Sequence, residues 1–484
     1  MTVARNLGAT LSGGSDKTAL IEVTDGAPTR AYSFDELDRR TRGFAAQLDV
    51  RRGERIGVLG ANSAAYVAAL FGIMRAGAVA VPINTRFPDT LVEYVIDDAA
   101  LTHVFADAAN ILRLKPDRHP VPLALAPPGE FDTTLPADAE TGIVLYTSGS
   151  TGQPKGVELS HESQWVMVER MRDRVAGVTG IVAAPLYHMN GLLFLMMLLA
   201  GRGSVVLLPR FDARRYLEAV HDHRVNMITG VPTMLSLMAR EVDLLGRLDL
   251  SCVYAVQIGS APLSETVIEQ VARLFPNARL SNGYGTTEAG AGMFGPHPDG
   301  LVVPPVSLGY PQPHVAVRLV GGASPDEGVL EVKTPAAMTR YLNQPEKTAA
   351  KRSADGWINT GDIMRRDRDG FFYFVGRDDD MFKCGGENIY PGEVERVLER
   401  DPRIAECCVV PVPDEVRGQM PVAFVVPVAD ASLDEDAVKQ VALAGAPAYM
   451  HPRRVFFLDR MPLAGTNKID RHHLAARAEE LTSR

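Results

Sequence analysis

The sequence contains little cysteine, and its cysteines form no metal-binding pattern. Cys252, Cys384, Cys407 and Cys408 are spread over a chain of 484 residues, and no CxxC spacing occurs among them. A cysteine-held metal site is therefore not expected, and we interpret the four as buried or incidental thiols. Cysteine usage of this kind fits a reducing compartment, so we expect the protein in the cytoplasm.

Long hydrophobic runs are also missing. The first residues, 1–14, contain no continuous apolar core of signal-peptide length. The longest apolar run, LLFLMMLLA at residues 192–200, is much shorter than the roughly 18 residues that cross a bilayer. We therefore expect no membrane span and interpret residues 192–200 as part of a buried helix.

The chain has no excess of positive charge. Its 50 lysine and arginine residues stand against 59 aspartate and glutamate residues, so the formal net charge is −9. This balance argues against a nucleic-acid partner. Hydrophobic residues at 46% and charged residues at 23% are typical of a globular protein. A chain of 484 residues exceeds a single core, which predicts at least two domains.

Apolar segments alternate with helical patterns through the N-terminal half. Residues 54–84 predict a buried strand, a helix that begins near Ser63 and a second strand that ends at Pro82. Such βαβ units imply a parallel sheet. Strand patterns return at residues 141–149, 203–209, 225–232 and 252–263. We therefore predict an α/β fold with doubly wound, mainly parallel sheets, whose ligands bind at the carboxyl ends of the strands.

The composition changes near residue 370. Residues 365–401 are dense in charge and glycine, and they precede a strand pattern at residues 405–414. Such a segment between two apolar regions is typical of a domain boundary. We place the boundary at Asp379, which gives an N-terminal domain of residues 1–378 and a C-terminal domain of residues 379–484.

The segment TSGSTGQPKG, residues 147–156, combines three glycines, four hydroxyl side chains and Lys155. Glycines free backbone N–H groups to point at an anion, and the ammonium adds charge, so the segment suits a polyphosphate. It is not a Walker-type loop, because Gln153 and Pro154 separate Gly152 from Lys155.

Four later segments carry further candidate residues. NGYGTTEAG, residues 282–290, offers Tyr284 to stack on a base and Glu288 to hold Mg²⁺, which prefers carboxylate and phosphate oxygens. GWINTGD ends at Asp362, whose two oxygens suit a ribose diol. GRDDDMFKCGG contains Arg377 as a donor fork, and GTNKIDR contains Lys468. Each residue alone is more often a capping or solvated group, but the combination is specific.

In order and spacing, these segments closely resemble the motifs of the adenylate-forming superfamily, which contains acyl-CoA synthetases, nonribosomal-peptide adenylation domains and beetle luciferases. The resemblance covers nearly the whole chain and favours the acyl-CoA synthetase and aryl-CoA ligase branch. It implies a small β-barrel-like subdomain within the large N-terminal domain and a smaller, mobile α+β C-terminal domain.

The resemblance also implies a reaction. A carboxylic acid and ATP, with Mg²⁺ as cofactor, would form acyl-AMP and pyrophosphate, and CoA would then take the acyl group and release AMP. Lys468 would bridge the substrate carboxylate and the α-phosphate, and Thr147, Glu288 and His188 complete the implied catalytic set. The implied ATP-binding residues are Thr147, Ser148, Gly149, Ser150, Thr151, Gly152, Lys155, Gly259, Ser260, Ala261, Pro262, Tyr284, Gly285, Thr286, Thr287, Asp362, Arg377 and Lys468, and Glu288 is the metal ligand.

The CoA step implies a second arrangement of the domains. The C-terminal domain would rotate about a hinge at Asp379, carrying Lys468 away and bringing in the loop around Gly385 and Gly386, where glycine lets the backbone approach a pantetheine chain. The implied contacts with the nucleotide part of CoA are Tyr449, His451 and Arg453. One residue departs from the family pattern, because Asn467 precedes the terminal lysine where glycine is usual. Asparagine tolerates left-handed backbone better than most residues, so we expect activity to be retained.

The nature of the acid is predicted from the implied acyl pocket. Its residues are His188, Met189, Asn190, Gly283 and Gly285. No arginine or lysine occurs at 187–192 or 282–294, and a second buried carboxylate would be costly without one. The sequence therefore favours an aromatic, alicyclic or medium-chain acid.

Two alternatives stay open: an enzyme that loads a carrier-protein thiol, and a malonyl-type CoA synthetase for a dicarboxylate. A nucleotide-binding protein without catalysis is disfavoured, because Lys155, Glu288, Asp362, Arg377 and Lys468 occur together. The expected partners are a small carboxylic acid, ATP and CoA, with no nucleic acid. Assembly as a homodimer is left open.

Overall fold

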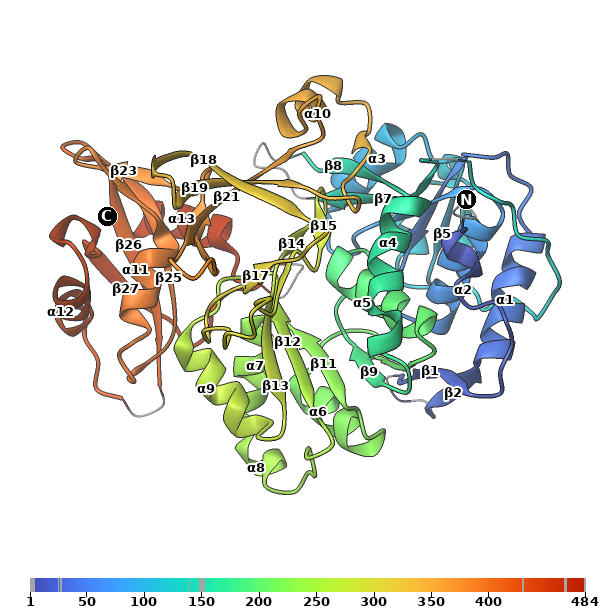
Figure 1. Cartoon of the computed structure of the whole chain (residues 1–484), viewed down its shortest axis with the longest axis horizontal. Helices are drawn as coiled ribbons and strands as arrows, with labels where there is room; N and C mark the ends of the chain where they lie inside the picture. The colour runs from blue at the N-terminus through green and yellow to red at the C-terminus, as the bar shows by residue number, and fades with distance from the viewer. Residues whose placement is uncertain are drawn as a thin grey trace.

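The computed structural model describes residues 5–24, 26, 28–137, 139–147, 153–428, 431–464 and 468–482. Its N-terminal part contains two seven-stranded sheets, and a smaller sheet follows in the C-terminal part (Figure 1). This is the predicted α/β architecture.

The first large sheet has the strand order β20-β8-β7-β4-β3-β5-β6. Strands β3 and β4 pair in parallel and are joined by α2, whose N-cap Ser63 accepts a hydrogen bond from the Tyr66 N–H. This confirms the βαβ unit predicted for residues 54–84. The elements are β3 (Arg55–Leu59), α2 (Ala64–Arg75), β4 (Val79–Pro82), β5 (His103–Ala106), β6 (Pro120–Pro122), β7 (Thr141–Thr147), β8 (Lys155–Ser160) and β20 (Arg340–Tyr341).

The second large sheet has the order β13-β12-β11-β9-β10-β1-β2. Its strands pair in parallel except for β1 with β2, so the later strand patterns of the sequence are confirmed as well. The strands are β1 (Thr18–Glu22), β2 (Arg30–Ser33), β9 (Thr179–Val182), β10 (Ser204–Leu207), β11 (Met227–Gly230), β12 (Ala255–Gly259) and β13 (Arg279–Gly283).

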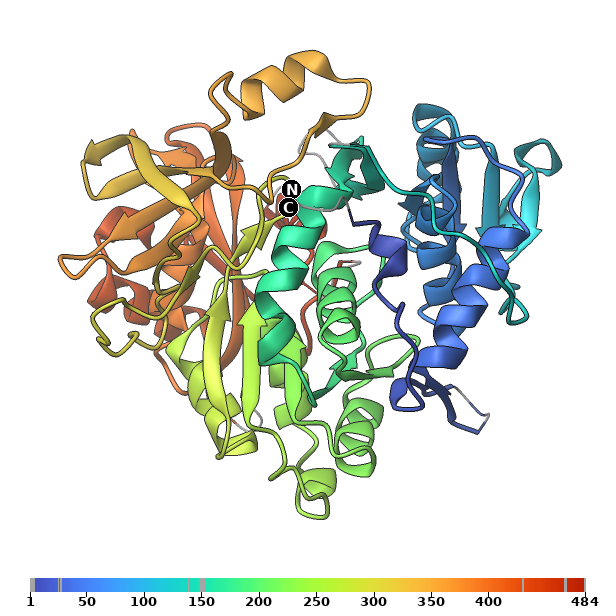
Figure 2. The ribbon, with the colours of Figure 1, turned by 45° about the vertical axis from the view of Figure 1, so that its right-hand side comes forward.

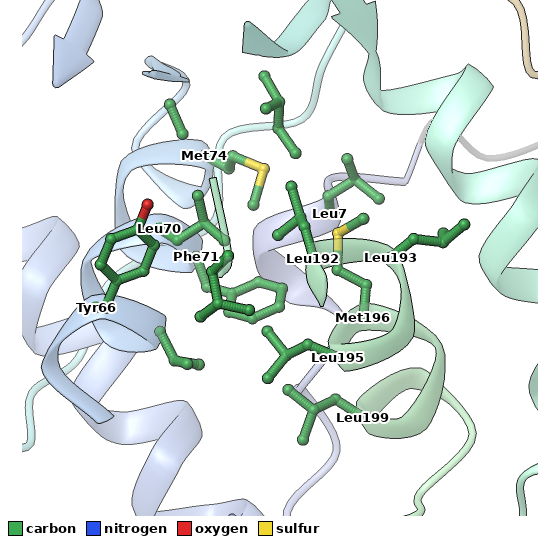
Figure 3. Close-up of a cluster of buried hydrophobic side chains, with 14 of the residues drawn as sticks. Leu7, Tyr66, Leu70, Phe71, Met74, Leu192, Leu193, Leu195, Met196 and Leu199 are labelled. Carbon is green, nitrogen blue, oxygen red and sulfur yellow. The ribbon is translucent and has the colours of Figure 1, made fainter. Parts of the chain in front are cut away.

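Helices α2 and α5 (Met189–Ala200) lie in the core between the two large sheets. Their side chains, among them Leu70, Phe71, Leu195 and Met196, face one another in a single buried cluster that also includes residues of both sheets (Figure 3). The apolar run at 192–200 is therefore a buried helix, as predicted. Among the described residues, no helix is both long enough and apolar enough to cross a membrane.

Other helices cover the outer faces of the sheets or connect their strands. Side chains of α3 pack on the first sheet, and those of α6, α7 and α9 pack on the second. The elements are η1 (Leu7–Ala9), α1 (Phe34–Ala46), α3 (Asp89–Asp98), η2 (Ile111–Arg113), η3 (Pro116–Arg118), α4 (His161–Met171), η4 (Arg172–Arg174), α6 (Ala213–Asp222), α7 (Pro232–Ala239), α8 (Val242–Leu245) and α9 (Glu265–Leu274).

A four-stranded antiparallel sheet with the order β18-β19-β21-β22 occupies the position of the expected subdomain. It places Asp362 of β21 directly opposite Arg377 of β22. The elements of this region are β14 (Gly285–Thr286), β15 (Gly290–Ala291), β16 (Phe294–Gly295), β17 (Tyr310–Pro311), β18 (Ala316–Ser324), β19 (Glu327–Lys333), α10 (Pro345–Lys351), β21 (Ile358–Arg366) and β22 (Phe372–Arg377).

The C-terminal sheet has the order β24-β23-β26-β25, with β27 paired to β26, and buried clusters line both of its faces. All of its elements follow Asp379, although the exact boundary at that residue stays a prediction. They are β23 (Phe382–Cys384), β24 (Glu387–Ile389), α11 (Pro391–Leu398), β25 (Ile404–Asp414), β26 (Gly418–Pro427), α12 (Glu435–Gly445), η5 (Ala448–Met450), β27 (Arg454–Phe457) and α13 (Arg471–Thr482).

The C-terminal elements contact helices that cover the second large sheet, and Figure 2 shows the chain from another side. The Thr266 hydroxyl at the start of α9 donates to the Glu399 carbonyl (2.9 Å), and Arg240 pairs with Glu406 (2.9 Å). Burial, with the nearby charge of Glu395, raises the pKa of Glu399 to about 7, against a lowering by its hydrogen bond with Ser264.

Glu399 is expected to make the stability of the protein depend on pH. A carboxyl with a raised folded-state pKa binds more protons when the protein is folded than when it is unfolded. The stability of the protein therefore falls as the pH rises from the ordinary pKa of the carboxyl to about 7. Glu399→Gln removes this penalty. At pH 8 it should raise the free energy of unfolding by about 1–2 kcal/mol. This is less than roughly 1.4 kcal/mol for each unit of pKa would give, because Glu399 is partly exposed and solvent screens its charge. Urea unfolding at pH 5 and pH 8 would measure this.

The exposed Glu415 provides the control for that experiment. The Glu415→Gln variant should follow the wild type at both pH values. A Glu399→Gln variant that is no more stable than wild type at pH 8 would contradict the prediction.

Candidate active site

The first part of the candidate site lies in the first large sheet, where β7 ends and β8 begins. Thr147 is the last residue of β7 and pairs with Lys155, the first residue of β8. The two ends of the predicted polyphosphate segment are therefore held together by the antiparallel pairing of these strands. Five predicted residues of that segment, Ser148, Gly149, Ser150, Thr151 and Gly152, lie outside the described residues, as does Asn467.

Lys155 and Glu288 are connected through a tyrosine. The Lys155 ammonium lies 5.1 Å from the centre of the Tyr341 ring, and the Tyr341 hydroxyl donates to Glu288 Oε1 (2.8 Å). The Met338 N–H donates to the Glu288 carbonyl (2.7 Å), which fixes the backbone that carries the carboxylate. The predicted phosphate-binding lysine and the predicted metal ligand are thus parts of one local structure.

Asp362 is held by two donors. The buried carboxylate accepts from Arg377 Nη1 (2.9 Å) at one oxygen and from the Tyr284 hydroxyl at the other. Burial, strengthened by the charge of Asp362, raises the pKa of Tyr284, so the phenol keeps its proton and remains a donor. The structure therefore brings together the three residues predicted to surround the nucleoside.

Arg377 also binds Asp379, the residue predicted as the hinge. Its Nε and Nη2 atoms donate to the two carboxylate oxygens of Asp379, at 2.9 and 3.0 Å. Burial opposes the charge of Asp379, but the hydrogen bonds and charge of Arg377 outweigh it, and the pKa of Asp379 is lowered. A single guanidinium thus links the predicted ribose-binding carboxylate to the predicted hinge residue.

The segment predicted for one side of the adenine slot follows β12. Gly259 lies so close to β13 that a Cβ atom there would lie 2.7 Å from the Gly283 carbonyl oxygen. Ser260 then adopts a φ of +66°, a conformation that non-glycine residues rarely adopt and that is common at functional sites. Ala261 and Pro262 complete the turn.

The residues after Tyr284 form a short antiparallel pair with a turn. Gly285 and Thr286 make up β14, and the Thr286 hydroxyl accepts from the Ala289 N–H (3.0 Å). Thr287 lies in the turn between β14 and β15, directly before Glu288. This compact turn presents Glu288 a few residues after Tyr284.

His188 is the N-cap of α5, followed by Met189 and Asn190 in the first turn. Its Nε2 atom is buried and has no hydrogen-bond partner among the described residues. Burial, together with the positive charges of Lys468 and Arg86, lowers the pKa of His188 to about 4. The imidazole is therefore neutral near pH 7, and its free nitrogen is available to a ligand.

Lys468 reaches the site from the C-terminal domain. Its carbonyl accepts from the Ala464 N–H (2.8 Å), and Arg86 of the N-terminal domain donates to the Ala464 carbonyl (3.0 Å). Burial lowers the pKa of Lys468, partly offset by the negative charge of Asp362. The charge of Lys468 lowers the pKa of His188, and the charge of Asp362 raises that of Lys468, so the ammonium is near both the predicted acyl residue and the predicted ribose-binding residue.

The structure does not bring the predicted CoA residues to this site. Gly385 and Gly386 form the exposed turn of the β23–β24 hairpin, with positive φ values and open space around them. Tyr449, His451 and Arg453 lie together after α12, where Arg453 Nη1 is 2.8 Å from His451 Nε2. These positions fit the prediction that the CoA step needs another domain arrangement, which stays a prediction.

Three residues at the site were missed by the sequence analysis: Arg86, Tyr341 and Lys351. Arg86 contacts the segment that carries Lys468, and Tyr341 bridges Lys155 and Glu288. Lys351 donates from Nζ to the Thr360 carbonyl (2.9 Å). For Tyr341 and Lys351, the sequence offers one signal, their place shortly before the WINTGD segment.

The donor set at the site suits a nucleotide and one metal ion that the nucleotide helps to hold. Tyr341 joins Lys155 to Glu288, Arg377 binds Asp362, and the charge of Asp362 acts on Lys468. No group of three or more potential metal ligands occurs among the described residues. Mg²⁺ commonly takes one or two carboxylates, with substrate phosphates and water as its other ligands, so Glu288 fits such an ion.

Comparison with known proteins identifies the family. The model of the AMP-binding enzyme family matches residues 9–342, and that of the AMP-binding enzyme C-terminal domain matches residues 393–468. A feruloyl-CoA synthase of Amycolatopsis sp is 35% identical, over 91% of this chain and 92% of its own. A 4-coumarate–CoA ligase-like protein of Arabidopsis thaliana is 31% identical, over 95% of this chain and 88% of its own.

A solved structure shows the same fold. An anthranilate CoA ligase in complex with anthranoyl-AMP superposes with a TM-score of 0.89 at 24% identity, covering 100% of this chain and 99% of its own. The predicted architecture of a large N-terminal part and a smaller C-terminal part is confirmed. The chain belongs to the AMP-binding enzyme family.

Proposed function

We propose that this protein is an ATP-dependent carboxylic acid–CoA ligase whose acid is aromatic. In the first step, a carboxylate oxygen of the acid bonds to the α-phosphorus of ATP and pyrophosphate leaves. In the second, the CoA sulfur bonds to the acyl carbon, the thiol gives up its proton and AMP leaves. The observation that carries the proposal is the position of the Lys468 segment, which Arg86 holds against the N-terminal part through the Ala464 carbonyl (3.0 Å). There the charge of Lys468 lowers the pKa of His188, and the charge of Asp362 raises that of Lys468.

The first step joins two anions, so the site must supply positive charge. Lys468 would neutralise the charge that develops between the acid and the α-phosphate, while Lys155 would follow the departing pyrophosphate. No general base is needed here, because a carboxylic acid is already ionised near neutral pH. A bound Mg²⁺ would be held by Glu288 and would supply further positive charge to the phosphates.

The nucleoside would be held by the groups around Asp362. Asp362 would accept the ribose hydroxyls and Arg377 would keep its carboxylate oriented. The turn at Gly259–Pro262 would form one side of the adenine slot, with Tyr284 on the other. Thr147 and the hydroxyl residues that follow it would donate to the phosphates.

Three features support an aromatic acid. The relatives that share about a third of their residues with this chain are named for feruloyl and 4-coumarate substrates. His188 is neutral near pH 7, so it offers a hydrogen bond to one carboxylate rather than a countercharge for a second. Residues 187–192 and 282–294 contain no arginine or lysine. A phenylpropenoic acid is therefore the first candidate.

For the second step we propose that the C-terminal domain, residues 379–484, rotates about Asp379. Lys468 would leave the site, and the turn at Gly385 and Gly386 would approach it with the pantetheine chain of CoA. Tyr449, His451 and Arg453 would contact the nucleotide part of CoA. Use of ATP and CoA is consistent with the cytoplasm as its location.

The test is release of AMP and pyrophosphate by the purified protein with ATP and Mg²⁺. Each acid of a panel is assayed with and without CoA: ferulate, 4-coumarate, benzoate, cyclohexanecarboxylate, octanoate and malonate. We expect AMP release that depends on CoA and is fastest with the phenylpropenoic acids. Acyl-adenylate formation that does not respond to CoA would instead favour a carrier-protein thiol as acceptor, and turnover of malonate alone would favour the dicarboxylate alternative.

A further inference from the structure

Lys351 is a lysine at the candidate site to which the reaction described above assigns no role. It is the last residue of α10, and its Nζ donates to the Thr360 carbonyl (2.9 Å). Arg377 Nη1 donates to the same carbonyl (3.2 Å). Two cations therefore meet at one backbone oxygen, two residues before Asp362.

The helix that carries Lys351 is attached to the phosphate end of the proposed site. The Thr348 hydroxyl, one turn before Lys351, accepts from the Tyr341 N–H (3.0 Å). Tyr341 in turn donates to Glu288 and lies beneath the Lys155 ammonium. A continuous set of contacts thus joins Lys351 to the proposed metal ligand and the proposed phosphate-binding lysine.

The charges around Lys351 point in the same direction. Burial has the largest effect on the pKa of Lys351 and lowers it. The charges of Arg377 and Lys155 lower it as well, whereas Glu288 raises it, and Asp362 raises it to a smaller extent. An ammonium has three donors, and the Thr360 carbonyl uses one of them. A cation placed among other cations in a partly buried site is costly, and a bound phosphate would add to the compensation that Glu288 and Asp362 provide.

We propose that Lys351 is a further ATP-binding residue, whose ammonium binds a phosphate oxygen while the Thr360 carbonyl holds its position. This inference rests on the proposed function. It assigns Lys351 to the triphosphate rather than to the ribose, because its contacts lead to Glu288 and Lys155. Its loss should therefore affect ATP much more than AMP.

The alternative is that Lys351 only fastens α10 to β21. A structural role of this kind would affect both nucleotides alike, because AMP and ATP share the ribose that Asp362 would hold. Under this alternative, the Lys351 variants would have a lower melting temperature than the wild type, and ATP and AMP would be weakened to the same extent. The ratio of ATP affinity to AMP affinity therefore separates the two roles.

The experiment compares binding of ATP and AMP, each with Mg²⁺, by isothermal titration calorimetry. Lys351→Met should raise the Kd of ATP about tenfold, the effect of losing one charge-assisted hydrogen bond, and change the Kd of AMP less than about twofold. Lys351→Gln keeps a donor for Thr360 without the charge and should show the same loss. Lys351→Arg should recover most of the ATP affinity.

The matched control is Lys347→Met, which removes an exposed lysine from the same helix and should bind like the wild type. Equal weakening of ATP and AMP in the Lys351 variants would overturn the inference, as would affinities equal to those of the Lys347 variant. Failure of the proposed function is distinguishable, because a wild type that binds ATP but releases no pyrophosphate with any acid would refute the ligase and leave the comparison of nucleotides valid.

Discussion

Replacing Lys468 by alanine is expected to slow acyl-adenylate formation by about a hundred- to a thousandfold, the usual effect of removing one donor that stabilises developing charge. Arg86 holds the segment that carries Lys468, and the charges of Lys468, His188 and Asp362 influence one another, so Lys468 is placed to act where the acid and the α-phosphate would meet. Thioester formation from synthetic acyl-adenylate and CoA should change less than about threefold, because Lys468 would be absent from the site in that step. Pyrophosphate release and thioester formation, measured separately, test this.

The control for Lys468 lies in the same domain. Lys439 on α12 forms an ion pair with Glu435 (2.8 Å), and Lys439→Ala should leave both half-reactions unchanged. Equal slowing of both half-reactions by Lys468→Ala would contradict the assignment, because it would indicate damage to the whole site.

The pH dependence of the first half-reaction gives a second readout for Lys468. Burial lowers its pKa, so the protonated form is lost at a lower pH than for an ordinary lysine, and the rate should fall at correspondingly lower alkaline pH. Arginine keeps its proton at all pH values used, so a partly active Lys468→Arg enzyme should lack this fall.

Replacing Arg377 by methionine is expected to impair stability and nucleotide binding together. The Asp362 side chain is only 7% exposed. Without Arg377, its carboxylate would be stabilised only by the hydrogen bond from the Tyr284 hydroxyl and by the charges of nearby lysines. Breaking a fully buried pair costs about 3–5 kcal/mol, and here we expect about 2–3 kcal/mol because 36% of the Arg377 side chain is exposed. Urea unfolding measures the loss, and calorimetry should show AMP and ATP weakened alike.

Arg368, an exposed residue in the turn between β21 and β22, offers the matched control. Arg368→Met should retain wild-type stability and nucleotide affinity. Arg377→Lys should recover only part of the loss, because an ammonium cannot bind Asp362 and Asp379 with the geometry of a guanidinium fork. A fully stable Arg377→Met protein would show that the pair contributes nothing to folding.

The strand ends that carry the candidate site were accessible from sequence because they follow apolar runs. Thr147 ends a buried strand, and Gly259 ends a strand whose residues alternate between partly buried and buried positions. Tyr341 and Lys351 were not accessible in this way. Tyr341 lies in a two-residue strand and Lys351 ends a short helix of ordinary composition, so no periodicity distinguishes them. Their importance depends on contacts with Glu288 and Thr360, which are distant in sequence.

The family, the α/β architecture and most candidate ligands followed from the chain alone, because local apolar patterns specify strands and helices and short motifs specify chemistry. The protonation states and side-chain contacts at the site did not follow from the sequence. Whether His188 is neutral, which carboxylates Arg377 binds, and whether Arg86 holds the segment of Lys468 depend on burial and on distances between segments up to several hundred residues apart. Burial and long-range distance arise only when the chain packs, so they are properties of the folded protein.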